Sequence, residues 1–243
     1  MNAIELCGLT KKFGRRTVVD DLTLSVGEGE LFALLGVNGA GKSTTIRMLS
    51  GVLTPDAGDA RIMGASILTE LQKVKSVINV SPQETAIAPN LTVSENLALI
   101  AGIYGANRAG AAAAAKDSIS EFSMEEIRNQ RAKTLSGGWQ RRLSIAMALI
   151  TQPKVLFLDE PTLGLDVLAR RELWREIEKL RGKMTVVLTT HYLEEAEALS
   201  DRIGILVSGR LTAVGTAEEL KKRAGKANFE DAFVALATGG TEA

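Results

Sequence analysis

Short apolar runs alternate with helical periodicity along most of the chain, a pattern typical of an α/β protein with a mostly parallel sheet. Continuous apolar runs predict buried strands at Leu31–Leu35, Val155–Leu158, Thr185–Thr189 and Ile203–Val207. The alternating segment Leu22–Val26 also reads as a strand. Together these runs indicate one sheet with helices on its faces.

Helical patterns occupy the intervals between these runs. We expect helices at Thr44–Ser50, over Leu143–Ile150 and at Asn228–Ala237. Thr216 and Glu219 have the spacing of a capping box, which predicts another helix start. The stretch from about 91 to 133 lacks strand-type runs but has helical patterns at 96–104 and 109–122, so it predicts a small helical lobe inserted into the core.

Composition narrows the possible partners and compartment. Among 243 residues, 29 Lys and Arg balance 29 Asp and Glu, which excludes bulk positive charge as a reason to bind nucleic acid or acidic lipid. The single cysteine, Cys7, excludes an intrachain disulfide and suits a reducing, cytoplasmic setting. We expect neither a signal peptide nor a membrane-spanning segment, because the sequence contains no apolar stretch of the required length.

A glycine-rich segment lies between the predicted strand at Leu31–Leu35 and the predicted helix at Thr44–Ser50, and it fits G-x-x-x-x-G-K-[ST]. Glycines allow successive backbone N–H groups to turn toward phosphates, and the following helix adds its positive dipole end. A chance glycine-rich turn is the alternative, which the flanking strand and helix disfavour. The segment therefore predicts a nucleoside triphosphate site formed by Gly36, Val37, Asn38, Gly39, Ala40, Gly41, Lys42, Ser43 and Thr44. Lys42 supplies charge to the β- and γ-phosphates, and the Ser43 hydroxyl can ligate Mg²⁺.

Two further segments carry the chemistry of phosphoryl transfer. Val155–Leu158 ends in Asp159 and Glu160, and ligands gather at the carboxyl ends of parallel strands. Asp159 can reach the Mg²⁺ side of the phosphates, and Glu160 can deprotonate a water in line with the γ-phosphate. Ser136-Gly137-Gly138 opens a helix, whose N-terminus is a second anion-binding device.

These motifs, in this order, resemble the ATP-binding subunits of ABC transporters over nearly the whole chain. The resemblance implies a P-loop NTPase fold in a single domain, with an N-terminal antiparallel β part. It places a RecA-like α/β core at residues 1–82 and 134–215, a helical lobe at about 83–133, and a short helical extension at 216–243. It also implies a helix over Ile119–Arg131 that leads to the Ser-Gly-Gly segment.

The resemblance assigns a role to each motif. Gly36–Thr44 corresponds to the Walker A loop, and Val155–Glu160 to Walker B. The signature of the family, which binds ATP held by a second subunit, corresponds to Leu135, Ser136, Gly137, Gly138 and Gln140. Lys42, Glu160 and His191 are then the catalytic residues, with Glu160 as the base and His191 as the switch histidine that contacts the γ-phosphate. A lone histidine is more often structural, but His191 follows a predicted strand at its carboxyl end.

The resemblance also assigns roles to three further residues and shows one departure from the family pattern. Gln83 looks like the glutamine that touches Mg²⁺ and marks the start of the helical lobe, so the implied magnesium ligands are Ser43, Gln83 and Asp159. Asp166 looks like the aspartate of the D-loop. Phe13 stands where the family places an aromatic ring that stacks on adenine, usually a tyrosine. Trp139 departs from the smaller or more flexible residue that usually follows the signature glycines.

The resemblance further implies partners and location. The segments after His191 and at Asn228–Ala237 resemble ABC-2 type exporter ATPases, including the drug-resistance group. We expect ATP and Mg²⁺ as cofactors, a second ATPase subunit in a homodimer, and a permease from a separate chain at the cytoplasmic face of the membrane, with no direct nucleic acid partner. Two alternatives remain: a soluble ABC ATPase acting on nucleic acid or ribosomes, and a scaffold that binds ATP without hydrolysing it.

Overall fold

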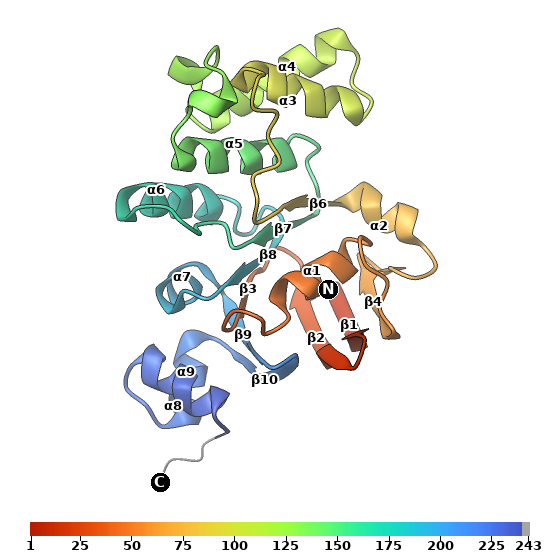
Figure 1. Ribbon diagram of the computed structural model, residues 1–243, viewed down its shortest axis with the longest axis vertical. Helices are drawn as coiled ribbons and strands as arrows, with labels where there is room; N and C mark the ends of the chain where they lie inside the picture. Colours follow the sequence, from red (N-terminus) through yellow and green to blue (C-terminus); the bar gives the residue numbers. More distant parts are fainter. Residues whose placement is uncertain (240–243) are drawn as a thin grey trace.

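The computed structural model describes residues 1–239, which form two sheets and the helices that cover them (Figure 1). The larger sheet has the strand order β10-β9-β3-β8-β7-β6. All neighbouring strands in it are parallel except the β10–β9 pair. Its strands are β3 (Leu31–Leu35), β6 (Ile78–Ser81), β7 (Val155–Asp159), β8 (Thr185–Thr190), β9 (Arg202–Val207) and β10 (Arg210–Gly215). The predicted mostly parallel sheet is thus confirmed.

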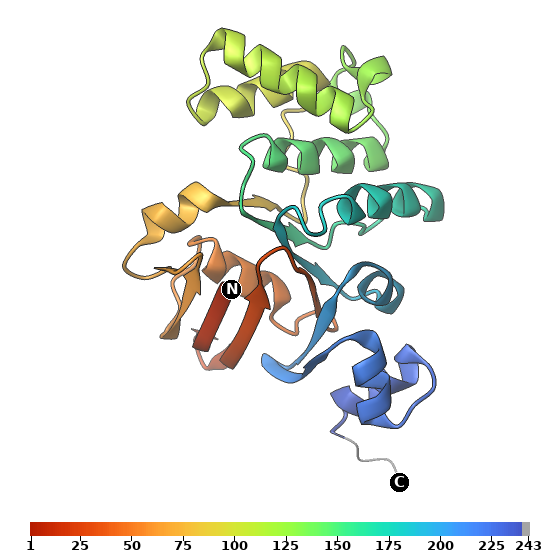
Figure 2. The same ribbon diagram turned by 180° about the vertical axis from the view of Figure 1, so that it is seen from behind.

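A smaller antiparallel sheet has the order β2-β1-β4-β5. A tight hairpin joins β1 and β2 and carries Phe13 at its end. The four strands are β1 (Asn2–Phe13), β2 (Arg16–Gly27), β4 (Ala57–Ile62) and β5 (Ala65–Ser66). This sheet confirms the expected N-terminal antiparallel part, and it lies beside the larger sheet in both views (Figures 1 and 2).

The central strand β3 explains why its sequence is apolar without interruption. Leu31, Ala33 and Leu35 belong to a core on the side of the helices that follow β6, β7 and β8. Phe32 and Leu34 belong to a second core shared with the antiparallel sheet. Because both faces of β3 are covered, none of its side chains can be polar, and all five residues are buried.

The helices cover the sheets and form the two ends of the molecule. The helices are α1 (Lys42–Leu49), α2 (Leu71–Val77), α3 (Val93–Ile103), α4 (Arg108–Glu121), α5 (Gly137–Leu149), α6 (Val167–Glu178), α7 (Leu193–Leu199), α8 (Ala217–Ala224) and α9 (Phe229–Ala237). Helices α3 and α4 pack together at the end of the molecule opposite α8 and α9 (Figures 1 and 2). Thr216 forms the predicted capping box with Glu219 at the start of α8.

One expected element is wrong. The chain does not form a helix over Ile119–Arg131, because α4 ends at Glu121 and Ser123 adopts a left-handed φ of 53°. The turn buries Phe122 and Met124, and two short 3₁₀ segments follow, at Glu125–Ile127 and Ala132–Thr134. Burial of two large side chains in the lobe core outweighs helix continuation.

The predicted domain boundaries stay a prediction. Residues 240–243 of the predicted extension lie outside the described residues. Within residues 1–239, no helix combines the length and apolar character needed to cross a membrane.

Candidate functional site

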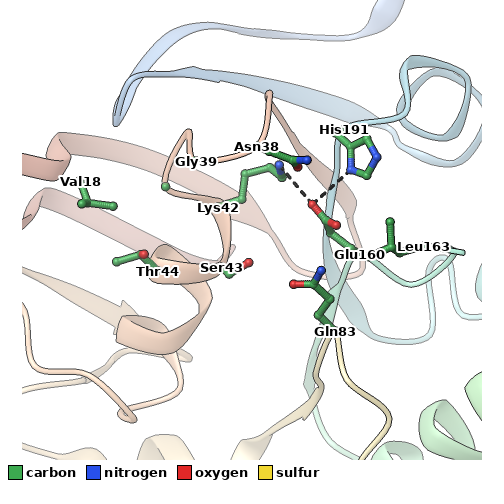
Figure 3. Close-up of a pocket in the computed structure, with 11 residues that line it drawn as sticks. Val18, Asn38, Gly39, Lys42, Ser43, Thr44, Gln83, Glu160, Leu163 and His191 are labelled. Carbon is green, nitrogen blue, oxygen red and sulfur yellow. Dashed lines mark hydrogen bonds and ion pairs between the residues drawn. The ribbon is translucent and has the colours of Figure 1, made fainter.

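The candidate site forms where four neighbouring parallel strands end. Strands β3, β8, β7 and β6 are adjacent in the sheet, and the chain leaves them into the segments carrying Gly36, His191, Glu160 and Gln83. The carboxyl ends of parallel strands meet at one edge, so residues distant in sequence converge there. Gln83, Glu160 and His191 line a cavity of about 360 Å³ there, together with Val18, Asn38, Gly39, Gly41, Lys42, Ser43, Thr44 and Leu163 (Figure 3).

The loop between β3 and α1 depends on glycine at two positions. Gly41 precedes α1 with a left-handed φ of 108°, and a Cβ there would lie 2.6 Å from the carbonyl oxygen of Val18. A Cβ on Gly36 would collide with the carbonyl oxygen of Leu206. The two glycines therefore let the loop pack against β2 and β9 and place Lys42 at the first turn of α1.

Lys42, Glu160 and His191 form a charged cluster inside the cavity. The Nζ of Lys42 donates to the carbonyl oxygens of Gly36 at 2.7 Å and Val37 at 3.2 Å, and lies 3.3 Å from Oε1 of Glu160. The Nδ1 of His191 lies 3.2 Å from the same carboxylate oxygen (Figure 3). Lys42 is 4% exposed and Glu160 is 7% exposed, so the ammonium and the carboxylate neutralise each other away from solvent.

Glu160 is held in an unusual backbone conformation. Its φ of 46° is left-handed, which costs a non-glycine residue roughly 1–3 kcal/mol. Its N–H group donates to both the carbonyl and the hydroxyl oxygen of Thr189, at 3.1 and 3.0 Å. These bonds to β8 fix the direction in which the carboxylate leaves β7.

Side-chain oxygen atoms that could ligate a metal ion lie beside this cluster. The Ser43 hydroxyl donates to Oδ1 of Asp159 at 3.0 Å, and the Thr189 hydroxyl donates to the same oxygen. Gln83 is exposed and extends its amide into the cavity (Figure 3). A hydroxyl, a carboxylate and an amide oxygen are the hard donors that Mg²⁺ accepts together with substrate phosphates, so these residues fit that ion.

The Ser-Gly-Gly segment lies apart from this cavity. Ser136 caps α5 through its backbone, and its hydroxyl makes no capping hydrogen bond; Ser136 and Gly137 are exposed. Gln140 instead turns inward, and its amide donates to the carbonyls of Ala132 and Leu135 at 3.2 and 3.1 Å. Trp139 packs partly buried against the core, under the guanidinium of Arg142 at 4.4 Å.

Phe13 and Asp166 are, among the described residues, also outside the cavity lining. Phe13 is 48% exposed, with the ammonium of Lys11 at 5.8 Å from its ring centre, so its face is open to a ligand. Asp166 caps α6 by accepting from the N–H groups of Leu168 and Ala169, at 2.9 and 3.0 Å.

Two buried charged residues near the site escaped the sequence analysis. Arg141 is 4% exposed and donates only to backbone carbonyls, and burial lowers its pKa to about 10. Glu195 is fully buried, accepting from Thr162 and Trp174, and burial raises its pKa above the ordinary value. Each lies four residues before a buried apolar residue of its helix, Ile145 and Leu199 respectively, and that spacing could have revealed both.

Comparisons with known proteins agree with this geometry. A family model described as "ABC transporter" matches residues 19–163. The daunorubicin/doxorubicin resistance ATP-binding protein DrrA of Streptomyces peucetius is 43% identical, over 92% of this chain and 68% of its own length. The Nod factor export ATP-binding protein I of Paraburkholderia xenovorans is 42% identical, over 90% of this chain and 72% of its own.

Solved structures extend the similarity to the fold. An ATP-binding subunit of an ABC transporter matches 96% of this chain and 99% of its own, with a TM-score of 0.84 at 30% identity. An ATP-binding cassette solved as a dimer in a post-hydrolysis state, bound to ADP and Pi, matches 88% of this chain and 98% of its own, with a TM-score of 0.78 at 27% identity. The chain belongs to the ABC transporter family, as one of its ATP-binding and ATP-hydrolysing subunits.

Proposed function

We propose that this chain hydrolyses ATP in the cavity at the ends of β3, β6, β7 and β8, and that it does so as one half of a homodimer that drives an exporter. The observation that carries the proposal is the convergence of Lys42, Ser43, Gln83, Glu160 and His191 on one cavity from four separate segments. These are the groups that phosphoryl transfer to water requires: a phosphate cradle, a cation, a metal site and a base.

The charged cluster gives each residue a task. Lys42 already lies between the carbonyls of Gly36 and Val37, so its ammonium is directed along the loop that cradles the phosphates. The triphosphate supplies a stronger counter-charge for Lys42 than Glu160 does, which frees the carboxylate to accept a proton from water. His191 contacts Oε1 of the same carboxylate, and from this position in the cavity it would face the γ-phosphate of a bound ATP.

Mg²⁺ is the metal that the neighbouring oxygen donors would hold, with Ser43, Asp159 and Gln83 as ligands. When bound, it neutralises the charge that develops on the β- and γ-phosphate oxygens. Thr189 contributes by fixing both Asp159 and the Glu160 peptide, so the metal ligand and the base keep one relative position.

The exposed helix tip at Ser136–Gly138 supplies the second half of each site. Within one chain it does not reach the cavity, yet it offers a free hydroxyl, backbone N–H groups and the positive end of α5. A second copy of the chain can present this tip to the γ-phosphate, with Asp166 at the seam and Phe13 stacked on adenine. The solved dimer with ADP and Pi supports this arrangement.

Closure and opening of the dimer would do the mechanical work, because ATP favours the closed state and its hydrolysis removes that preference. Relatives named for drug resistance and for Nod factor export support an exporter, with the chain bound at the cytoplasmic face of the membrane through a separate permease. The permease, rather than this chain, would select the exported molecule.

Phosphate release by the purified chain tests the proposal. We expect the wild-type chain to release phosphate from ATP with Mg²⁺, and Glu160→Gln to lose roughly 10²–10⁴ of the turnover while still binding ATP. Unchanged turnover in Glu160→Gln would remove Glu160 from the role of base. Absence of hydrolysis by the wild-type chain would favour the ATP-binding scaffold.

A further inference from the structure

Arg141 lies near the start of α5 and is enclosed by the chain segments that follow β6 and β7 at the cavity. Its Nε donates to the carbonyl of Pro161 at 2.8 Å, and one terminal nitrogen donates to the carbonyl of Asp159 at 2.6 Å. The other terminal nitrogen donates to the carbonyls of Pro82 and Gln83, the latter at 3.1 Å. One side chain thus joins α5 to four backbone carbonyls, which lie at the end of β7 and in the segments that follow β6 and β7.

The four carbonyls belong to the residues that position the base and the metal ligand. Asp159 and Pro161 flank Glu160 on both sides, so Arg141 fixes the peptide segment that holds Glu160 in its left-handed conformation. Pro82 and Gln83 form the turn that carries the Gln83 amide into the cavity. A shift of Arg141 would move both groups together.

The helix that carries Arg141 begins at the tip formed by Ser136 and Gly137. Arg141 lies about one helical turn after Gly137, and α5 is rigid, since eight of its residues are buried. The helix tip and the guanidinium therefore move as one body. Movement of the tip reaches Glu160 and Gln83 through Arg141.

The stability of the fold does not by itself explain why a buried arginine occupies position 141. Arg141 forms no ion pair within the part of the chain that the structure describes, although Asp159, Glu195 and Glu160 lie near enough to favour its charge. Burial of a charge with neutral partners is costly, and an apolar side chain of similar volume would often stabilise such a site more. The planar fork of arginine can, however, satisfy several carbonyls in fixed directions, which lysine cannot do.

We propose that Arg141 is a positioning residue that ties the Glu160 peptide and the Gln83 loop to the Ser136 helix tip of the same chain. The inference rests on the proposed function, in which that tip contacts ATP held by the partner copy. Arg141 then couples the two ATP sites of the dimer. When the tip of one chain meets the γ-phosphate of the partner's ATP, Arg141 transmits the contact to the base and the metal ligand of its own site.

Arg141→Lys tests this role, with Arg142→Lys as the matched control on the adjacent residue of the same helix. Arg142 contacts the Trp139 ring and the exposed Glu172, away from the cavity. For both variants we would measure kcat and KM for ATP, binding of a fluorescent ATP analogue, and the thermal unfolding midpoint. We expect Arg141→Lys to lose about tenfold to hundredfold in kcat, because a displaced base costs that much. Its ATP affinity should stay close to the wild type, while its unfolding midpoint should fall, because lysine leaves some of the four buried carbonyls without a donor. Arg142→Lys should keep kcat within about twofold.

A second readout separates positioning from folding. We expect Glu160→Gln alone to form an ATP-dependent dimer and the double variant with Arg141→Lys to form less of it. Wild-type kcat in Arg141→Lys would overturn the inference, as would a loss of kcat matched by an equal loss of ATP affinity and folded protein. Failure of the wild-type chain to hydrolyse ATP, or of Glu160→Gln alone to dimerise, would instead contradict the proposed function itself.

If Arg141→Lys does not fold, hydrogen exchange on Glu160→Gln keeps the question open to test. Addition of ATP and Mg²⁺ should slow exchange in the first turns of α5 and at residues 82–84 with the same dependence on ATP concentration. Different midpoints for the two segments would overturn the coupling.

Discussion

The cavity at the strand ends and the tip of α5 differ in how complete they are within one chain. In the cavity, Lys42 and Glu160 are buried, and each makes contacts to its own chain. At the tip, Ser136 and Gly137 are exposed, and the Ser136 hydroxyl makes no capping bond. The first region is preorganised for chemistry, whereas the second is shaped to meet something outside the chain. This difference supports our proposal that one copy can bind a nucleotide but requires a second copy to complete the site.

Removal of the cavity cation should have the largest effect on ATP binding. Lys42→Ala should weaken ATP binding by roughly 10²-fold, since one charged hydrogen bond contributes up to about 3 kcal/mol. Isothermal titration with ATP and Mg²⁺ measures this. Lys179→Ala, at an exposed ion pair with Glu176, is the matched control and should bind as the wild type does. Retention of wild-type affinity in Lys42→Ala would contradict the phosphate-loop assignment.

A charge at the helix tip should stop turnover but spare the cavity. In Gly137→Asp, the carboxylate would repel the γ-phosphate of the partner's ATP, and we expect roughly 10²-fold lower turnover. The monomer should keep its ATP affinity and its stability, because an acid near a helix N-terminus is favourable. Gly137→Ala is the control, since a Cβ there would meet only Leu165, at 3.9 Å. Equal losses of ATP affinity and turnover in Gly137→Asp would contradict the separate roles of the helix tip and the cavity.

Phe13 should contribute a smaller share of ATP affinity. Loss of a stacking ring costs about 1–3 kcal/mol, so Phe13→Ala should weaken ATP binding by roughly tenfold. Phe13→Tyr should restore it, because stacking requires only the face of the ring. Fluorescence titration distinguishes the variants, and identical affinities for Phe13→Ala and the wild type would place adenine elsewhere.

Glu195 should produce the smallest effect, as a dependence of stability on pH. Because its pKa is raised in the folded chain, the folded state binds more protons between the ordinary and the raised value, and stability falls as pH rises through that window. Glu195→Gln should remove this fall and raise the unfolding midpoint at pH 8, because no buried carboxylate then has to lose its proton. Glu194→Gln, on the exposed side of α7, should leave the midpoint unchanged. A midpoint that falls equally with pH in Glu195→Gln and the wild type would contradict the buried-charge explanation.

Much of the sheet and the cavity could be predicted because the signals are local. The apolar runs at β3, β7, β8 and β9 each lie in one segment. The glycine pattern directly follows β3, and the Asp159-Glu160 pair lies at the end of β7. Strands β4 and β6 were harder to predict, because β4 contains a glycine and two charges and β6 has only four residues. Their pairing partners in the sheet define them more than their own composition does.

The roles of Arg141 and Glu195 could not be predicted in the same way. From the sequence alone, all the glutamates of α7 could face solvent. In the structure, Glu194 and Glu197 are exposed but Glu195 is buried. The acceptors of Arg141 are backbone carbonyls about 20 and 60 residues away along the chain. Backbone carbonyls carry no residue signature, so only the folded chain reveals such contacts.

The most direct test measures the molar mass of Glu160→Gln in solution, with and without ATP and Mg²⁺, by light scattering coupled to size-exclusion chromatography. The account predicts a monomer without nucleotide and a dimer with it, and it predicts that the additional substitution Gly137→Asp returns the protein to a monomer. A molar mass that stays at that of one chain under saturating ATP and Mg²⁺ would contradict the completion of each site by a second copy.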